Sequence, residues 1–180
     1  MSKILRLSKN GIIRVFLICA AFIHFWAVLR FLDQLEWLQE LGLWQMAGFF
    51  SYMLLLALLE ALLVWAILVG ISFLLPKTWT EDQKVLFLGN FAWISWLALI
   101  FAQYLLPNEL PTGVVLGVVA ALGVLVMAVV QWFTLKRASI RAVQLDLFSR
   151  VEVLAVLFLG LDVVSLVVVL LRNIFWLRLT

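Results

Sequence analysis

Five stretches of this chain are apolar for long enough to cross a membrane as helices. They cover approximately residues 12–31, 47–75, 85–106, 113–133 and 151–171. A helix rises ~1.5 Å per residue, so ~20 apolar residues cross a hydrocarbon core of ~30 Å. The pattern predicts an all-α integral membrane protein, built as a bundle of five transmembrane helices.

The composition excludes a soluble globular protein. Of the 180 residues, 67% are apolar and 13% are charged, whereas soluble domains are about half apolar and about a quarter charged. The length fits one domain, so we expect residues 1–180 to form a single transmembrane helical domain. Cys19 is the only cysteine in the sequence, which excludes a disulfide within the chain and a cysteine metal cluster.

Lysine and arginine residues indicate the orientation of the chain, because cytoplasmic loops are enriched in both. With the N-terminus inside, Arg30, Arg172 and Arg178 lie outside, and the other ten of the 13 basic residues lie inside. Five crossings then place the C-terminus outside. The basic start of the chain is followed by no recognisable cleavage site, so we expect a retained signal anchor in a bacterial inner (cytoplasmic) membrane.

Two connections have helical patterns of their own. The segment RFLDQLEWLQELGLWQM, Arg30–Met46, places apolar residues on one face and Asp33, Glu36 and Glu40 on another. It predicts a short amphipathic interfacial helix over about residues 31–45, between the first two spans. The basic segment of residues 135–150 predicts a second short helix, which lies against the inner leaflet.

Polar side chains lie near the midpoints of four spans, at similar depth. They are His24, Glu60, Ser95 and Asp162. A charged side chain at mid-membrane costs ~3 kcal/mol on insertion scales, so we expect these groups to face the interior of the bundle. Glu60 and His24 lie on consecutive antiparallel helices and are the expected pair. Ser165 follows Asp162 by one turn and is expected on the same inward face.

This polar layer has two main interpretations. Buried polar pairs contribute only ~0.6–2 kcal/mol but select one packing of otherwise apolar helices. Alternatively, Glu60 and Asp162 belong to a proton or ion relay, which needs titratable groups and access for water. The sequence supplies the groups for both interpretations, and we favour the packing role.

Three site chemistries would use the same residues. Ser95, His24 and Asp162 are the residue types of a hydrolytic triad, but WISWL around Ser95 lacks the glycines that expose such a serine. His24, Glu60 and Asp162 lie on different spans, without the spacing of paired metal ligands on one helix, so we expect no metal site. In AAFIHFWAVL, Ala20 precedes His24 by four residues, which resembles the A-x-x-x-H pattern of bacterial light-harvesting helices. The resemblance implies pigment or haem ligation by His24, whereas the residues by themselves predict no cofactor.

A row of small residues marks the fourth span. Gly113 and Gly117 form a G-x-x-x-G pair, and Ala121 continues the row. Small side chains let a second helix approach closely. The row therefore predicts a helix-packing interface, either with a partner or within this bundle.

The sequence contains no nucleotide-binding loop, zincin motif or hydrophilic domain. We therefore expect no enzymatic activity and no nucleic-acid partner. We predict a structural or binding subunit of a larger membrane assembly, in contact with lipid and with other membrane subunits or copies of itself. The alternative is a proton- or ion-coupled carrier or channel that uses Glu60 and Asp162. Five helices in this orientation also resemble the membrane anchor of lipoteichoic-acid-synthase-type envelope phosphotransferases, which implies an anchor whose catalytic residues lie outside this chain.

Overall fold

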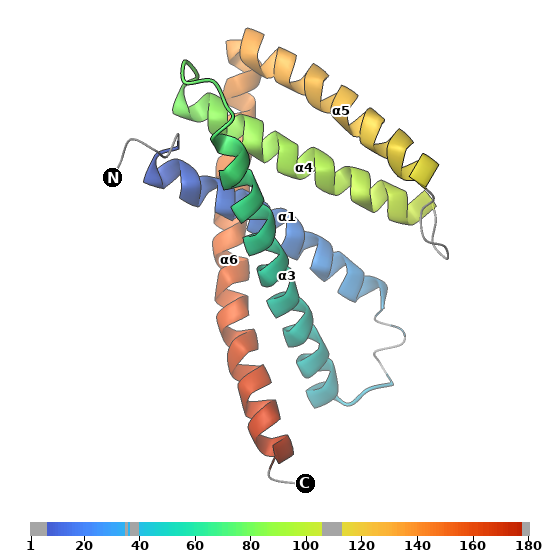
Figure 1. Ribbon diagram of the computed structural model, residues 1–180. Helices are drawn as coiled ribbons and strands as arrows, with labels where there is room; N and C mark the ends of the chain where they lie inside the picture. Colours follow the sequence, from blue (N-terminus) through green and yellow to red (C-terminus); the bar gives the residue numbers. More distant parts are fainter. Residues whose placement is uncertain (1–6, 35, 37–39, 106–112, 178–180) are drawn as a thin grey trace. The chain divides into compact units, whose positions relative to one another are not determined.

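The described part of the chain folds into long helices, as the apolar stretches predict. The computed structural model describes residues 7–34, 36, 40–105 and 113–177. Its helices are α1 (Lys9–Asp33), α3 (Leu43–Ser72), α4 (Glu81–Leu105), α5 (Gly113–Lys136) and α6 (Ala138–Leu177), shown in Figure 1. All five are long and apolar enough to cross a membrane, which confirms an all-helical chain with five candidate spans.

The last helix is longer than the sequence pattern indicates. The short helix predicted over residues 135–150 is not a separate element, because residues 138–150 form the first turns of α6, which continues without a break to Leu177. This prediction is wrong because residues 138–150 contain no glycine or proline that would end the helix. At 40 residues, or ~60 Å, α6 is about twice as long as a hydrocarbon core is thick.

The predicted interfacial helix over residues 31–45 lies partly outside the described residues, because residues 35 and 37–39 are not described. Within that range α1 continues through Asp33, and α3 begins at Leu43. The interfacial helix therefore stays a prediction. So does the orientation of the chain in the membrane.

The chain divides into two compact units. Unit 1 contains Met1–Val15 and Ala66–Arg150, and unit 2 contains Phe16–Trp65 and Val151–Thr180. Whether both belong to the single domain predicted for residues 1–180 stays a prediction.

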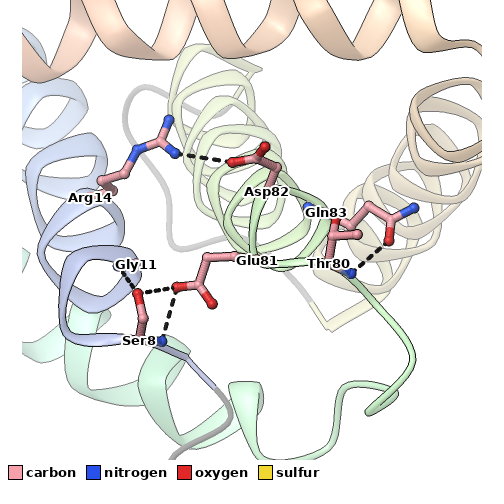
Figure 2. Close-up of polar contacts among 7 residues, drawn as sticks. All are labelled: Ser8, Gly11, Arg14, Thr80, Glu81, Asp82 and Gln83. Carbon is pink, nitrogen blue, oxygen red and sulfur yellow. Dashed lines mark hydrogen bonds and ion pairs between the residues drawn. The ribbon is translucent and has the colours of Figure 1, made fainter.

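In unit 1, α4 begins at a reciprocal capping box. The backbone N–H of Gln83 donates to Thr80 Oγ1 at 3.3 Å, and the backbone N–H of Thr80 donates to Gln83 Oε1 at 2.9 Å (Figure 2). Glu81 and Asp82 in the first turn place negative charge at the positive end of the helix dipole. The sequence TEDQ thus fixes the first turn of α4.

The same turn of α4 holds the start of α1, also in unit 1. Ser8 caps α1 by accepting the Gly11 N–H at 3.1 Å, and its own hydroxyl donates to Glu81 Oε1 at 2.6 Å (Figure 2). A side chain at Gly11 would overlap the Glu81 carboxylate. Arg14 pairs with Asp82 at 3.4 Å. The first turns of α1 and α4 therefore lie together at one end of unit 1.

Helices α4 and α5 form an antiparallel hairpin in unit 1 (Figure 1). A Cβ atom at Gly123 would lie 3.8 Å from Ala98 Cβ, so these two positions face each other and set the register. On another face of α4, Gly89 lies against the ring of Phe148, from the first part of α6, which is itself buried. The absence of a side chain at Gly89 allows this close approach.

In unit 2, ring contacts set the register between α1 and α3. Phe16 contacts Trp65 with ring centroids 5.8 Å apart, and Phe31 contacts Phe50 with centroids 4.7 Å apart. Both pairs fit one antiparallel alignment, in which His24 lies at the level of Ala57 on α3. Ala57 is buried and small, which leaves room beside it for larger groups of the neighbouring helices.

Helix α6 adds the third element of unit 2. The Tyr52 hydroxyl of α3 donates to Asn173 Oδ1 at 3.0 Å. Gly48 of α3 lies against the guanidinium group of Arg172, which would overlap any side chain at that position. These contacts join the start of α3 to the last turns of α6.

Candidate functional site

A histidine on α1 and an aspartate on α6 form the buried polar centre of unit 2. His24 Nε2 lies 3.0 Å from both Oδ1 and Oδ2 of Asp162. The side chains are 0% and 4% exposed. The sequence predicts that both residues face inward, and the structure brings these two together.

The pattern of α6 explains why Asp162 faces inward. Its buried residues in unit 2 alternate at spacings of three and four: Ala155, Phe158, Asp162, Ser165 and Val169. This spacing keeps one face of a helix on a neighbour. Ser165 is buried on the face of Asp162, as predicted. Phe158, one turn before Asp162, stacks on the His24 ring with centroids 5.4 Å apart.

The hydrogen bonds of His24 determine where its protons lie. Nδ1 is 2.8 Å from the carbonyl oxygen of Ala20, one turn earlier on α1. A carbonyl oxygen only accepts, so Nδ1 carries a proton and donates it. One further proton lies between Nε2 and the Asp162 carboxyl group. In either position of that proton the pair has no net charge, which is compatible with its complete burial.

Glu60 is not part of this centre, so the expected pairing of Glu60 with His24 is wrong. Both ring nitrogens of His24 are engaged by Ala20 and Asp162, and the position of α3 at the level of His24 is Ala57. Glu60 lies near the middle of α3 but is exposed. Within the described residues its carboxylate has no hydrogen-bond or ion-pair partner.

Ser95 belongs to unit 1, whereas His24 and Asp162 belong to unit 2. It is half-buried on α4 and lines an apolar groove between α4 and α5, together with Phe91 and Gly123. Unit 2 therefore holds the histidine and the aspartate of the three residue types considered for a hydrolytic triad, and His24 is bonded to Asp162 and to the Ala20 carbonyl. The hydroxyl nearest to them in sequence is that of Ser165, which shares the face of Asp162.

The surroundings of His24 also bear on ligand binding. A metal or macrocycle on the imidazole would need Nε2, which faces Asp162 in this arrangement. Among the described residues no group of three or more histidine, cysteine, aspartate and glutamate side chains has the geometry to hold a metal ion.

The small-residue row of α5 is exposed among the described residues. Gly113, Gly117 and Ala121 are all exposed. A Cβ atom at Gly113 or Gly117 would have no described atom within 4 Å. Helix α5 thus contacts α4 through a different row that contains Gly123. Whether the row of Gly113, Gly117 and Ala121 forms a helix-packing interface stays a prediction.

Two polar features of unit 1 were not predicted from the sequence. The first is the cluster of Ser8, Glu81, Arg14 and Asp82, which the capping pattern TEDQ signals at residues 80–83. The second is a pair of buried amides, since Asn90 Nδ2 and both amide atoms of Gln131 lack a hydrogen-bond partner among the described residues. The α4–α5 register places these two amides opposite each other.

Comparison with known proteins gives no match: no protein-family model, curated protein or solved structure matches this chain.

Proposed function

We propose that this protein is a small subunit of a membrane assembly. It binds a transmembrane segment of another polypeptide on the exposed face of α3 that contains Glu60. The observation that carries the proposal is the exposed carboxylate of Glu60 near the middle of an apolar 30-residue helix. Facing lipid alone, such a group costs ~3 kcal/mol. A partner that donates hydrogen bonds to it offsets this cost.

The surface around Glu60 fits a helical partner. Leu56, Leu59 and Leu63 are each more than half exposed and lie one turn or less from Glu60. A stripe of leucines around one polar side chain is a contact face that selects its partner by the polar group. The exposed Gly117 on α5 offers a second place of close approach.

A second copy of this chain is a poorer partner for Glu60. Arg14, Arg30 and Arg172 lie toward the ends of their helices, and Arg150, farther inside α6, pairs with Asp146. His24, the one histidine of the chain, is buried and bonded to Asp162. We therefore infer a different polypeptide that carries a basic or amide side chain at the depth of Glu60.

The alternative proposal, a proton-coupled carrier, would use the same carboxylate and Asp162. Complete burial of the His24–Asp162 pair supports a packing role for Asp162, because a relay needs contact with water. We place the protein in a bacterial inner membrane with its N-terminus inside, and the distribution of lysine and arginine supports this orientation.

Replacing Glu60 with Leu is expected to release the partner, because an apolar residue leaves the partner's donor without an acceptor in lipid. Glu60→Gln keeps an acceptor oxygen and is expected to retain more of the partner than Glu60→Leu does. The measurement is the molar ratio of partner to tagged chain after mild extraction. Leu59→Ala is the control for loss of apolar area alone. Equal partner ratios in Glu60→Leu and the wild type would contradict the role of Glu60, and loss of proton flux in Glu60→Gln would favour the carrier.

Enlarging Gly117 to Leu tests the second contact. Because the described chain leaves open space there, the substitution is expected to leave the stability of the isolated chain unchanged or raised by up to ~1 kcal/mol, since Leu is the better helix former. The partner ratio is expected to fall. If thermal unfolding in detergent shows a clear loss of stability instead, the glycine row packs within this chain.

A further inference from the structure

A groove runs along the hairpin of α4 and α5 in unit 1, with a volume of about 570 Å³. Its walls are almost entirely apolar and include Trp93, Leu97 and Phe101 of α4 with Leu122, Val126 and Val130 of α5. Volumes of ~300–1,000 Å³ are typical of small-molecule sites. In a membrane, the small molecule that fits an apolar groove of this kind is a hydrocarbon chain.

The α5 wall of this groove continues into a cationic end. Val126 and Val130 are followed at helical spacing by Phe133 and Arg137. The guanidinium carbon of Arg137 lies 5.3 Å from the centroid of the Phe133 ring, and Arg137 is exposed. Next to it, the exposed Lys136 ammonium lies 4.1 Å from the Trp132 centroid. Two cations, each held over an aromatic ring, thus lie where α5 ends.

The acidic residues of unit 1 that lie near the start of α4 are already engaged. Glu81 accepts hydrogen bonds from Ser8, and Asp82 pairs with Arg14. Arg137 directly follows α5, and its side chain lies over the Phe133 ring without an ion pair to an acid among the described residues. The end of the hairpin that contains Arg137 is therefore suited to an anion.

We propose that this groove binds one acyl chain of an anionic phospholipid, with the phosphate at Arg137. The groove extends from Val119 to Val130 on α5, twelve residues whose Cα atoms span ~16 Å along the helix, which is about the depth of one leaflet of a ~30 Å core. Large side chains on both walls keep a second helix from close approach. The small-residue row that would admit one lies on a different row of α5, at Gly113 and Gly117.

The test is native mass spectrometry of the purified full chain from micelles that contain equal amounts of phosphatidylglycerol and phosphatidylcholine. The wild type is expected to retain one lipid, predominantly phosphatidylglycerol. Val126→Trp fills the groove and is expected to remove the bound lipid. Val129→Trp adds the same side chain at an exposed α5 position that does not line the groove. This control variant is expected to retain the bound lipid.

The cation is tested separately. Arg137→Gln is expected to keep a bound lipid but to lower the preference for phosphatidylglycerol about fivefold, the factor for one basic residue near an anionic surface. Arg150→Gln removes a cation that pairs with Asp146 on α6, and is expected to leave the preference unchanged. A wild type that retains no lipid, equal retention by Val126→Trp and Val129→Trp, or an unchanged preference in Arg137→Gln would each overturn the proposal.

Discussion

Asp162→Leu is expected to lower the free energy of unfolding by about 1–3 kcal/mol, because it leaves Nε2 of the completely buried His24 without a partner. Asp162→Asn is expected to cost less. Its amide N–H can donate to Nε2 while Nδ1 of His24 continues to donate to the Ala20 carbonyl. Unfolding of the protein in mixed micelles by increasing fractions of dodecyl sulfate, followed by tryptophan fluorescence, measures these differences.

The double variant His24→Leu/Asp162→Leu separates the pair from its surroundings. Removal of both partners is expected to cost less than the sum of the two single variants, because no buried polar group is left alone. His24→Leu by itself is expected to be at least as damaging as Asp162→Leu, since it leaves the acid unpaired. Additive losses in the double variant would show that the 3.0 Å contact is not a coupled pair.

Gly89→Leu is the second substitution with a large expected effect. A Cβ atom at Gly89 would lie 2.7 Å from Cε2 and 3.1 Å from Cζ of the Phe148 ring, and both residues are buried. Overpacking of this kind typically costs about 1–3 kcal/mol. We expect the same dodecyl sulfate titration to show a loss in that range.

Two variants calibrate this result. Gly160→Leu adds the same side chain on α6 where no described atom lies within 4 Å of a new Cβ atom, and is expected to be tolerated. Gly89→Leu combined with Phe148→Ala is expected to recover part of the loss, because the ring that obstructs the new side chain is gone. Equal stability of Gly89→Leu and Gly160→Leu would contradict the close packing of α4 on Phe148.

The helices were predictable because long apolar runs are an unambiguous signal of membrane-spanning segments. Rotation of α3 about its axis was not predictable from hydrophobicity, since apolar residues lie all around this helix. For this reason Glu60 was expected to pair with His24, whereas the residue that pairs with His24 is Asp162. The sequence did contain one signal for the rotation of α3, a row of small residues on its buried face: Gly48, Ser51, Ala57 and Ala61. Their spacing places Glu60 beside that face rather than on it.

Other contacts are made by polar side chains, and the pattern of apolar residues does not predict them. The capping box at Thr80 and Gln83 was visible in the sequence, but the reach of Glu81 to Ser8 depends on how α1 and α4 pack in unit 1. The inward face of α6 was better predicted, because Asp162 and Ser165 lie one turn apart in an otherwise valine-rich run and are both buried.

The most direct test of the proposed function is native mass spectrometry of the wild-type chain, extracted gently from the membranes that produce it. The exposed Glu60 carboxylate on α3 predicts a complex in which this chain is joined by at least one different membrane polypeptide at a fixed ratio. A chain that appears alone, or only with copies of itself, under conditions that preserve other membrane complexes would contradict the subunit proposal.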